Sequence, residues 1–165
     1  MADQKQRFSK FRMTPKRMRR LLRLYGPYLG AGVSVEHISD DWRELRVALH
    51  MRWYNRNAFG THFGGSLYSM VDPHLALLLS QILGREYVVW DKSASIDFRK
   101  PGMGTVRSTL RVDDEDLALI REKTESGEPY LHDFKVEIRD EKDIVVAKVH
   151  KVLYVRRKKS EGRGA

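Results

Sequence analysis

The chain has 165 residues, a length typical of one domain with its own hydrophobic core. Its 41% hydrophobic and 32% charged residues indicate a globular protein, and the lack of cysteine excludes disulfides, thiol nucleophiles and cysteine zinc sites. No apolar run approaches the ~20 residues that span a bilayer, and the first residues lack the apolar segment of a signal peptide. We therefore expect a cytoplasmic protein with a single domain over residues 1–165, ordered over about 14–158 and flexible at both ends.

The net charge of +9 is concentrated at the two ends of the chain. Residues 1–30 carry nine Lys and Arg and one acid, a net charge of +8. Residues 156–165 carry five Lys and Arg and one acid, a net charge of +4. The remaining residues, 31–155, therefore have a net charge of −3. A nucleic-acid-binding core normally carries a basic face of its own, so we do not expect this core to bind nucleic acid. The ends could still contact RNA, anionic lipid or the phosphate of a ligand.

The first predicted element is a helix. It begins at Thr14-Pro15, an N-cap hydroxyl followed by a proline at the first helical position. It ends at Gly26-Pro27. One stripe has the spacing i, i+3, i+4, i+7 of a packed helical face, and basic residues cover the rest; the stripe consists of Met18, Leu21, Leu22 and Tyr25.

Two strand-like runs and a second helix follow. Residues 33–35 and 45–53 alternate apolar and polar side chains, as strands do. After a turn-rich segment at 55–61, residues 65–83 read as a helix that is apolar around most of its circumference. Such a helix must be buried on nearly all sides.

The remainder of the chain is dominated by strand patterns. Further strands are predicted at 87–90, 93–98, 106–112, 130–138 and 144–155, with a short helix at 116–123. This order predicts an α+β fold in which one antiparallel sheet curls around the helix at 65–83. A single sheet can cover only part of this helix. We therefore predict that a second copy of the chain covers the remaining apolar face and the edges of the sheet.

Asp72 is the only charged residue between Arg56 and Arg85. A lone carboxylate in a buried helix destabilises the fold unless it pairs with another group or has a function that compensates. We interpret Asp72 as a candidate general base. Pro73 would kink the helix and open space beside it. The alternative interpretation is that Asp72-Pro73 simply caps a helix that restarts after a break.

Gly64-Gly65 lies at the start of the same helix. Free backbone N–H groups there can stabilise a developing oxyanion, although paired glycines can also form an ordinary tight turn. Eight residues of helix separate Gly64 from Asp72 by ~12 Å, too far for both to act on one carbonyl. If both are catalytic, each serves a site completed by a partner subunit.

The run from Asn57 to Gly65, followed by Asp72, resembles the signature of hotdog-fold acyl-CoA thioesterases of the phenylacetate-pathway type. Their pattern is N-x-x-G-x-x-H-G-G with an acid seven positions after the last glycine, and it is matched in register by Asn57, Gly60, Gly64, Gly65 and Asp72. Residues 96–102 also resemble that superfamily's strand ending in F-x-x-P, and the chain over roughly 14–158 is similar to its DUF4442 branch. The family's histidine is replaced by Phe63, with His62 one place earlier.

The resemblance implies a hotdog fold that acts as a homodimer or a dimer of dimers on an acyl thioester, without a metal or a separate cofactor. Asp72 would act as general base or nucleophile, Asn57 would orient the water or the carbonyl, and the Gly64 N–H would hold the oxyanion. The remaining expected contacts are with the substrate: Gly65, His62 and Phe63 near the thioester, Met70, Val71 and Trp90 along the acyl chain, and Arg56, Arg99 and Lys100 at the phosphates of CoA.

Other functions stay open at this point. The replacement of the family histidine favours a protein that binds acyl thioesters without hydrolysing them, and the basic ends allow a protein that binds RNA or acidic membranes. A hotdog dehydratase or hydratase is less well supported, because its histidine arrangement is not found. His132 and His150 fall on opposite faces of the last hairpin, so no metal site is expected there. The sequence does not specify the length of the acyl chain or whether the thioester is to CoA or to a carrier protein. It also does not specify whether the protein is a dimer or a tetramer.

Overall fold

The computed structural model describes residues 13–159, which form six strands and five α-helices. The helices are α1 (Pro15–Arg23), α2 (Gly26–Ala31), α3 (Gly64–Ser69), α4 (His74–Leu83) and α5 (Asp114–Lys123), and the 3-10 turn η1 is Gly84–Glu86. The strands are β1 (Val33–Ile38), β2 (Glu44–His50), β3 (Tyr87–Phe98), β4 (Thr105–Arg111), β5 (Tyr130–Arg139) and β6 (Val145–Arg157). The predicted flexible ends concern residues that lie outside this range.

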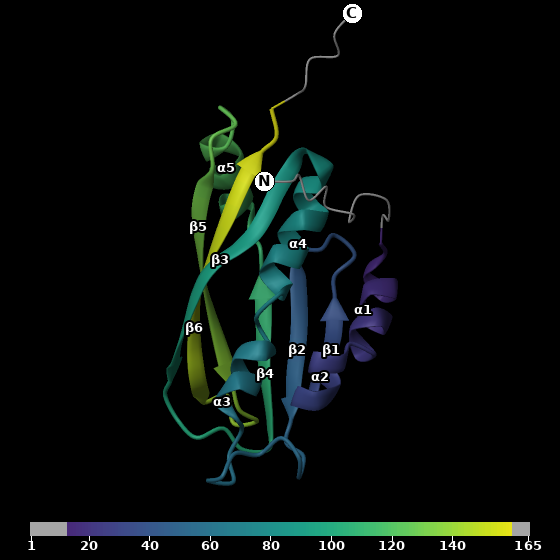
Figure 1. Cartoon of the computed structure of the whole chain (residues 1–165), viewed down its shortest axis with the longest axis vertical. Helices are drawn as coiled ribbons and strands as arrows, with labels where there is room; N and C mark the ends of the chain where they lie inside the picture. Colours follow the sequence, from purple (N-terminus) through teal and green to yellow (C-terminus); the bar gives the residue numbers. More distant parts are fainter. Residues whose placement is uncertain (1–12, 160–165) are drawn as a thin grey trace, which may run out of the picture.

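All six strands form one antiparallel sheet in the order β1-β2-β4-β5-β6-β3, so β1 and β3 are its edges. Figure 1 shows α3 and α4 lying against one face of the curled sheet, with α1 and α2 beside β1. The predicted α+β architecture, a curled antiparallel sheet around a central helical segment, is therefore confirmed.

The core lies between α4 and the concave face of the sheet. Leu75, Leu78 and Leu79 of α4 are completely buried, as the apolar circumference of this segment predicted. Alternate residues of β6 point toward them, because successive side chains of a strand face opposite sides. Lys151 occupies one of these inward positions and is also completely buried.

The helical segment at 65–83 is not continuous. It is divided by a turn at residues 70–73, since Pro73 has no N–H to continue the hydrogen-bond ladder. Helix α1 ends at Arg23, before the predicted stop, and Gly26-Pro27 instead begins α2, which the sequence did not predict. Proline is well suited to the first turn of a helix. The two runs predicted at 87–90 and 93–98 form one long strand, with a bulge between Asp91 and Ser93.

The two N-terminal helices are fixed to the body of the protein. The Thr14 side chain accepts a hydrogen bond from the Arg17 N–H and caps α1. Of the predicted apolar stripe, Met18 packs into the core and Leu22 packs against it, but Leu21 and Tyr25 are about half exposed, so the packed face of α1 is narrower than predicted. Tyr28 packs into the core from α2. The Tyr28 hydroxyl lies 3.2 Å from Nε2 of His74, which ties α2 to α4. Between residues 13 and 159, no helix is long and apolar enough to cross a membrane.

Candidate active site

Asp72 lies in the turn between α3 and α4, where its N–H bonds to the carbonyl of Tyr68 at 3.1 Å. Its side chain does not cap α4, since the N-cap position is Pro73 and no side chain bonds to the first turn. The helix does restart after a break here, as the alternative interpretation held, but the capping role that it gave to Asp72 is wrong. The carboxylate is instead 44% exposed on one side and bonded to the protein on the other.

The bonded side of Asp72 faces Lys151 of β6. The Lys151 ammonium lies 3.0 Å from Oδ1 of Asp72 and 2.6 Å from Oδ1 of Asp91 on β3, and it also donates to the Asp72 carbonyl. The Asp91 contact is an ion pair without the alignment of a hydrogen bond. A fully buried ammonium is tolerated only when such partners compensate for its lost hydration.

Tyr68 completes the fixation of Asp72. Its hydroxyl donates a hydrogen bond to the same oxygen, Oδ1, from one helical turn earlier. Burial raises the pKa of Tyr68, and the hydrogen bond to Asp72 and the charges of Asp72 and Asp91 raise it further, so the hydroxyl stays protonated and acts as a donor. Oδ2 of Asp72 has no hydrogen-bond partner within residues 13–159, so one carboxylate oxygen is held and the other is available.

His74 lies behind this group but does not share its chemistry. It is completely buried, and burial together with the charge of Lys151 lowers its pKa from 6.5 to about 3. Burial and the charge of Asp72 also raise the pKa of Tyr28, its hydrogen-bond partner. Both side chains are neutral at physiological pH and connect helices, so neither is a candidate for proton transfer.

The second candidate group is the start of α3. Gly64 and Gly65 donate no backbone hydrogen bond to any residue within 13–159, so their N–H groups are available to an anion. Aromatic rings lie close to both glycines: a Cβ on Gly64 would lie 2.9 Å from the Phe98 ring, and one on Gly65 would lie 2.5 Å from the Phe63 ring, so either ring would have to shift for a larger residue. Two half-exposed aromatic rings therefore flank the helix start.

Asn57 and His62 hold the loop before α3. The Asn57 amide donates to Oγ1 of Thr61 at 2.8 Å, and its oxygen accepts from the N–H groups of Phe59 and Thr61. His62 is 2% exposed, and its Nε2 lies 3.0 Å from the carbonyl of Gly104. Burial lowers the pKa of His62, so its ring is neutral. The expected contact of His62 with substrate does not fit these positions, because the ring points into the protein.

The structure does not bring together the three residues expected along the acyl chain. Met70 and Val71 are completely buried in the core. Trp90 is 58% exposed and lies on the opposite face of β3 from the buried Val89, because adjacent strand residues alternate. The predicted tunnel past all three residues is therefore corrected: Trp90 belongs to the outer face of the sheet.

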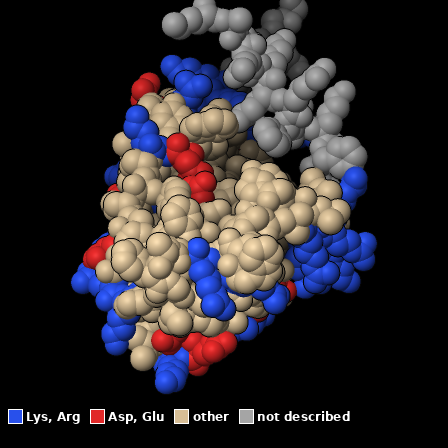
Figure 2. Space-filling model, turned by 60° about the horizontal axis from the view of Figure 1, so that its bottom comes forward, with Lys and Arg blue, Asp and Glu red and all other residues tan. Residues whose placement is uncertain are grey.

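The three expected phosphate contacts are exposed and lie at the end of the molecule that carries Gly64. Arg99 and Lys100 directly follow Phe98, whose ring packs on Gly64, and Arg99 pairs with Asp97. Arg56 lies in a bridge with His62 at the same end. Figure 2 shows that uncharged side chains cover most of the face seen from this end, with charges mainly toward its rim. The segments before α3 and after Ile96 of β3 carry large exposed apolar side chains: Trp53, Tyr54, Phe59, Phe63, Phe98 and Met103.

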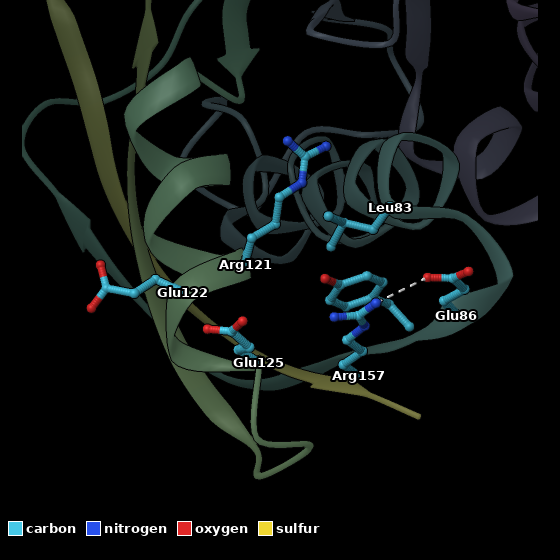
Figure 3. Close-up of a pocket in the computed structure, with 7 residues that line it drawn as sticks. Leu83, Glu86, Arg121, Glu122, Glu125 and Arg157 are labelled. Carbon is cyan, nitrogen blue, oxygen red and sulfur yellow. Dashed lines mark ion pairs between the residues drawn. The ribbon is translucent and has the colours of Figure 1, made fainter. Parts of the chain in front are cut away.

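A hollow of about 470 Å³ lies elsewhere, where the end of α4 meets α5 and the end of β6 (Figure 3). It is lined by Leu83, Glu86, Tyr87, Arg121, Glu122, Glu125 and Arg157. Arg157 pairs with Glu86 at 3.8 Å, and acids and bases nearly balance around the opening. Because Asp72, Gly64 and Gly65 are not among its lining residues, this hollow is not the candidate active site.

Sequence reasoning missed Tyr68, Asp91 and Lys151. A signal for Lys151 was present, since it occupies an inward position in the apolar alternation of β6 and a lysine there requires a partner. The sequence did not identify that partner, because Asp72 is 79 residues away.

These features can be compared with known proteins. The chain belongs to the family described as Domain of unknown function (DUF4442), whose model matches residues 15–155. A crystal structure from Pseudomonas aeruginosa, described as a protein of unknown function and probable thioesterase, superposes with a TM-score of 0.74 at 19% identity, covering 87% of this chain and 96% of that one. A thioesterase from Haemophilus influenzae has a TM-score of 0.65 at 12% identity, covering 94% and 99%.

A third structure, a variant of another Pseudomonas aeruginosa thioesterase, has a TM-score of 0.65 at 11% identity and covers 90% of this chain and 99% of that one. These similarities establish the hotdog fold. No curated protein matches the chain.

Proposed function

We propose that this protein hydrolyses acyl thioesters at a site built around Asp72. The observation that carries the proposal is the arrangement of its carboxylate. Lys151 and Tyr68 hold Oδ1, while Oδ2 is open. A carboxylate fixed in this way keeps its direction, which is a property that a base or nucleophile needs. Thioesterases among proteins of the same fold support this assignment.

We further propose that the site is shared between two copies of the chain. Strand β3 is an edge of the sheet, and most of its residues from Ser93 to Phe98 are exposed. A long, weakly charged edge strand is an aggregation hazard unless another strand covers it. Antiparallel pairing of two β3 strands about a two-fold axis between Ala94 and Ser95 would place Asp91 opposite Phe98 of the partner subunit.

This pairing would bring the two chemical groups together. Asp91 contacts Lys151, which holds Asp72, and Phe98 packs on Gly64. The open oxygen of Asp72 in one subunit would then lie near the helix start of the other. Within one chain, Gly64 and Asp72 are too far apart to act on the same carbonyl. Association through β3 would instead pair Asp72 of one subunit with Gly64 of the other.

In the proposed reaction, Oδ2 of Asp72 takes a proton from a water molecule while the water oxygen attacks the thioester carbonyl; direct attack by the carboxylate, followed by hydrolysis of the resulting anhydride, is the alternative. The Gly64 N–H stabilises the oxyanion. Collapse breaks the C–S bond, and the thiolate leaves readily because the pKa of a thiol is ~8.5. The products are a carboxylic acid and a thiol. We assign Asn57 the role of holding the loop that positions Gly64.

The proposed substrate is an acyl-CoA or an acyl-carrier thioester. Arg99, Lys100 and Arg56 would meet its phosphates at the end of the molecule that carries the helix start, since exposed cations attract phosphate groups. Exposed apolar side chains between them would contact the acyl and pantetheine parts.

Release of free thiol from a panel of acyl-CoA thioesters tests this function. Wild-type protein should release thiol, and Asp72→Asn should lower the rate about a hundredfold or more, because an amide cannot accept the proton. Circular dichroism and the melting temperature establish that the variant is folded. Equal rates in the two proteins would rule out Asp72 as the catalytic group.

A second candidate function is binding of acyl thioesters without hydrolysis. The observation that favours it is the half-exposed Phe63 ring close to Gly65, at the position where the thioesterase signature that the sequence resembles has histidine. In that case acyl-CoA raises the melting temperature, while thiol release stays at background for every chain length.

A further inference from the structure

The segment formed by α1, α2 and the link between them carries four exposed apolar residues within nine positions of the chain. Their exposed fractions are 50% for Leu21, 78% for Leu24, 49% for Tyr25 and 55% for Leu29. A single exposed leucine needs no explanation. Several large apolar side chains in one short segment indicate a surface with a binding partner.

The same segment is strongly basic. No Asp or Glu occurs from residue 14 to residue 35, whereas α1 contains five cations: Lys16, Arg17, Arg19, Arg20 and Arg23. The next acid along the chain is Glu36, whose carboxylate pairs with Arg107 at 3.2 Å. Figure 2 shows Lys and Arg gathered at the right-hand side of the molecule, where α1 lies. Arg19 is only partly exposed, so we define the α1–α2 surface by the four exposed cations Lys16, Arg17, Arg20 and Arg23 and the four exposed apolar residues.

This surface is presented by helices that are anchored on their other side. Met18 packs into the core, and Arg19 donates a hydrogen bond to the Glu36 carbonyl at 2.9 Å. The buried Tyr28 fixes α2. The outward side chains therefore cannot turn into the core of the same subunit. Because α1 lies against β1, pairing of two subunits along β3, the opposite edge, would leave the surface uncovered.

We propose that the α1–α2 surface binds peripherally to anionic lipid bilayers. Cations near a negatively charged membrane attract its headgroups, and leucine and tyrosine side chains enter the interfacial layer. The first twelve residues, which lie outside the described part of the chain, add four Lys and Arg and only one acid in sequence. The whole N-terminal segment therefore has the charge that complements anionic lipid.

Two other partners fit the surface less well. RNA would be attracted by the cations but gains little from exposed leucines. A second copy meeting the same surface about a two-fold axis would bring four exposed cations against four, which is repulsive. Of these three partners, only an anionic bilayer uses both the charge and the apolar side chains.

Flotation of the full-length protein with lipid vesicles tests the proposal. Binding is expected to vesicles with roughly one third phosphatidylglycerol in phosphatidylcholine, to weaken with salt, and to be absent with phosphatidylcholine alone. Arg20→Gln/Arg23→Gln should weaken binding roughly 25-fold, about fivefold for each charge. Leu24→Gln/Leu29→Gln should weaken it about tenfold or more. The control Leu131→Gln/Lys135→Gln changes exposed residues of β5 and should bind as wild type does.

Three outcomes would overturn the proposal. One is no binding of the wild type to the anionic vesicles. Another is unchanged vesicle binding by Leu24→Gln/Leu29→Gln, which would mean that charge alone causes the attraction. That result would favour RNA as the partner, and binding of a labelled RNA oligonucleotide is measured in parallel. The third is a lower oligomer mass of the same variant in gel filtration without lipid, which would identify a contact between subunits.

Discussion

The ammonium nitrogen of Lys151 lies 3.0 Å from a carboxylate oxygen of Asp72, although 79 residues separate them in the chain. Lys151 belongs to β6, which lies between β5 and the edge strand β3, whereas Asp72 belongs to a turn that interrupts the central helical segment. Because the lysine is completely buried and the carboxylate half-exposed, the strand anchors the turn and leaves one oxygen facing outward.

Lys151→Met should lower the rate constant kcat for thioester hydrolysis while leaving KM nearly unchanged. Without the ammonium, Asp72 can rotate away from its working direction, and a misplacement of ~1 Å costs on the order of a hundredfold in rate. Steady-state thiol release measures both constants. Lys148→Met is the matched control on the same strand, since Lys148 is exposed and pairs with Glu137. An unchanged kcat in Lys151→Met would mean that the lysine only supports the fold.

The Gly64 N–H can be tested by comparing Gly64→Pro with Gly64→Ala. Both variants add a Cβ that would meet the Phe98 ring at 2.9 Å, but only proline removes the N–H. Proline is also tolerated at the first position of a helix. We expect kcat of the proline variant to fall on the order of a hundredfold below that of the alanine variant. Equal rates for the two would exclude this N–H as an oxyanion donor.

Complementation between two inactive chains tests whether the site is shared. Asp72→Asn and Gly64→Pro chains, co-expressed with different affinity tags, should yield a purified mixed dimer with about half the activity of the wild type, because one of its two sites receives both intact groups. If Asp72 and Gly64 of one chain served the same site, every site of the mixed dimer would carry one lesion. The mixed dimer would then be inactive.

Acidification should destabilise the protein through His74. Its pKa is lowered from 6.5 to about 3, so below pH 6.5 the unfolded chain binds a proton that the folded protein excludes. Above pH 6.5 the exclusion of this proton costs the folded protein no stability. As the pH falls from 6.5 toward 3, it progressively lowers the free energy of unfolding. Between about pH 7 and about pH 4, the wild type should lose on the order of 3 kcal/mol more than His74→Gln. Urea unfolding at both pH values measures this difference, and parallel losses in the two proteins would contradict it.

The fold could be predicted because local patterns specify it. Alternation identified the strands, and the apolar circumference of residues 65–83 identified the buried helical segment. The isolation of Asp72 also indicated a special residue, although its catalytic role remains a prediction. Its partners could not be found in the same way, because Lys151 and Asp91 reach it only after distant strands pair. Helix α2 was missed because Gly26-Pro27 is a stop signal as well as a start.

The buried lysine also bears on the fidelity of folding. An alternating strand such as β6 tolerates a slip of two residues along its neighbours without reversing its apolar and polar faces. Such a slip would bring Val149 or Leu153 to the two carboxylates and carry the ammonium into a purely apolar layer. A slip of one residue would turn the ammonium outward. Only one alignment of the strand satisfies Lys151, so the residue that holds Asp72 also discriminates against misregistered sheets.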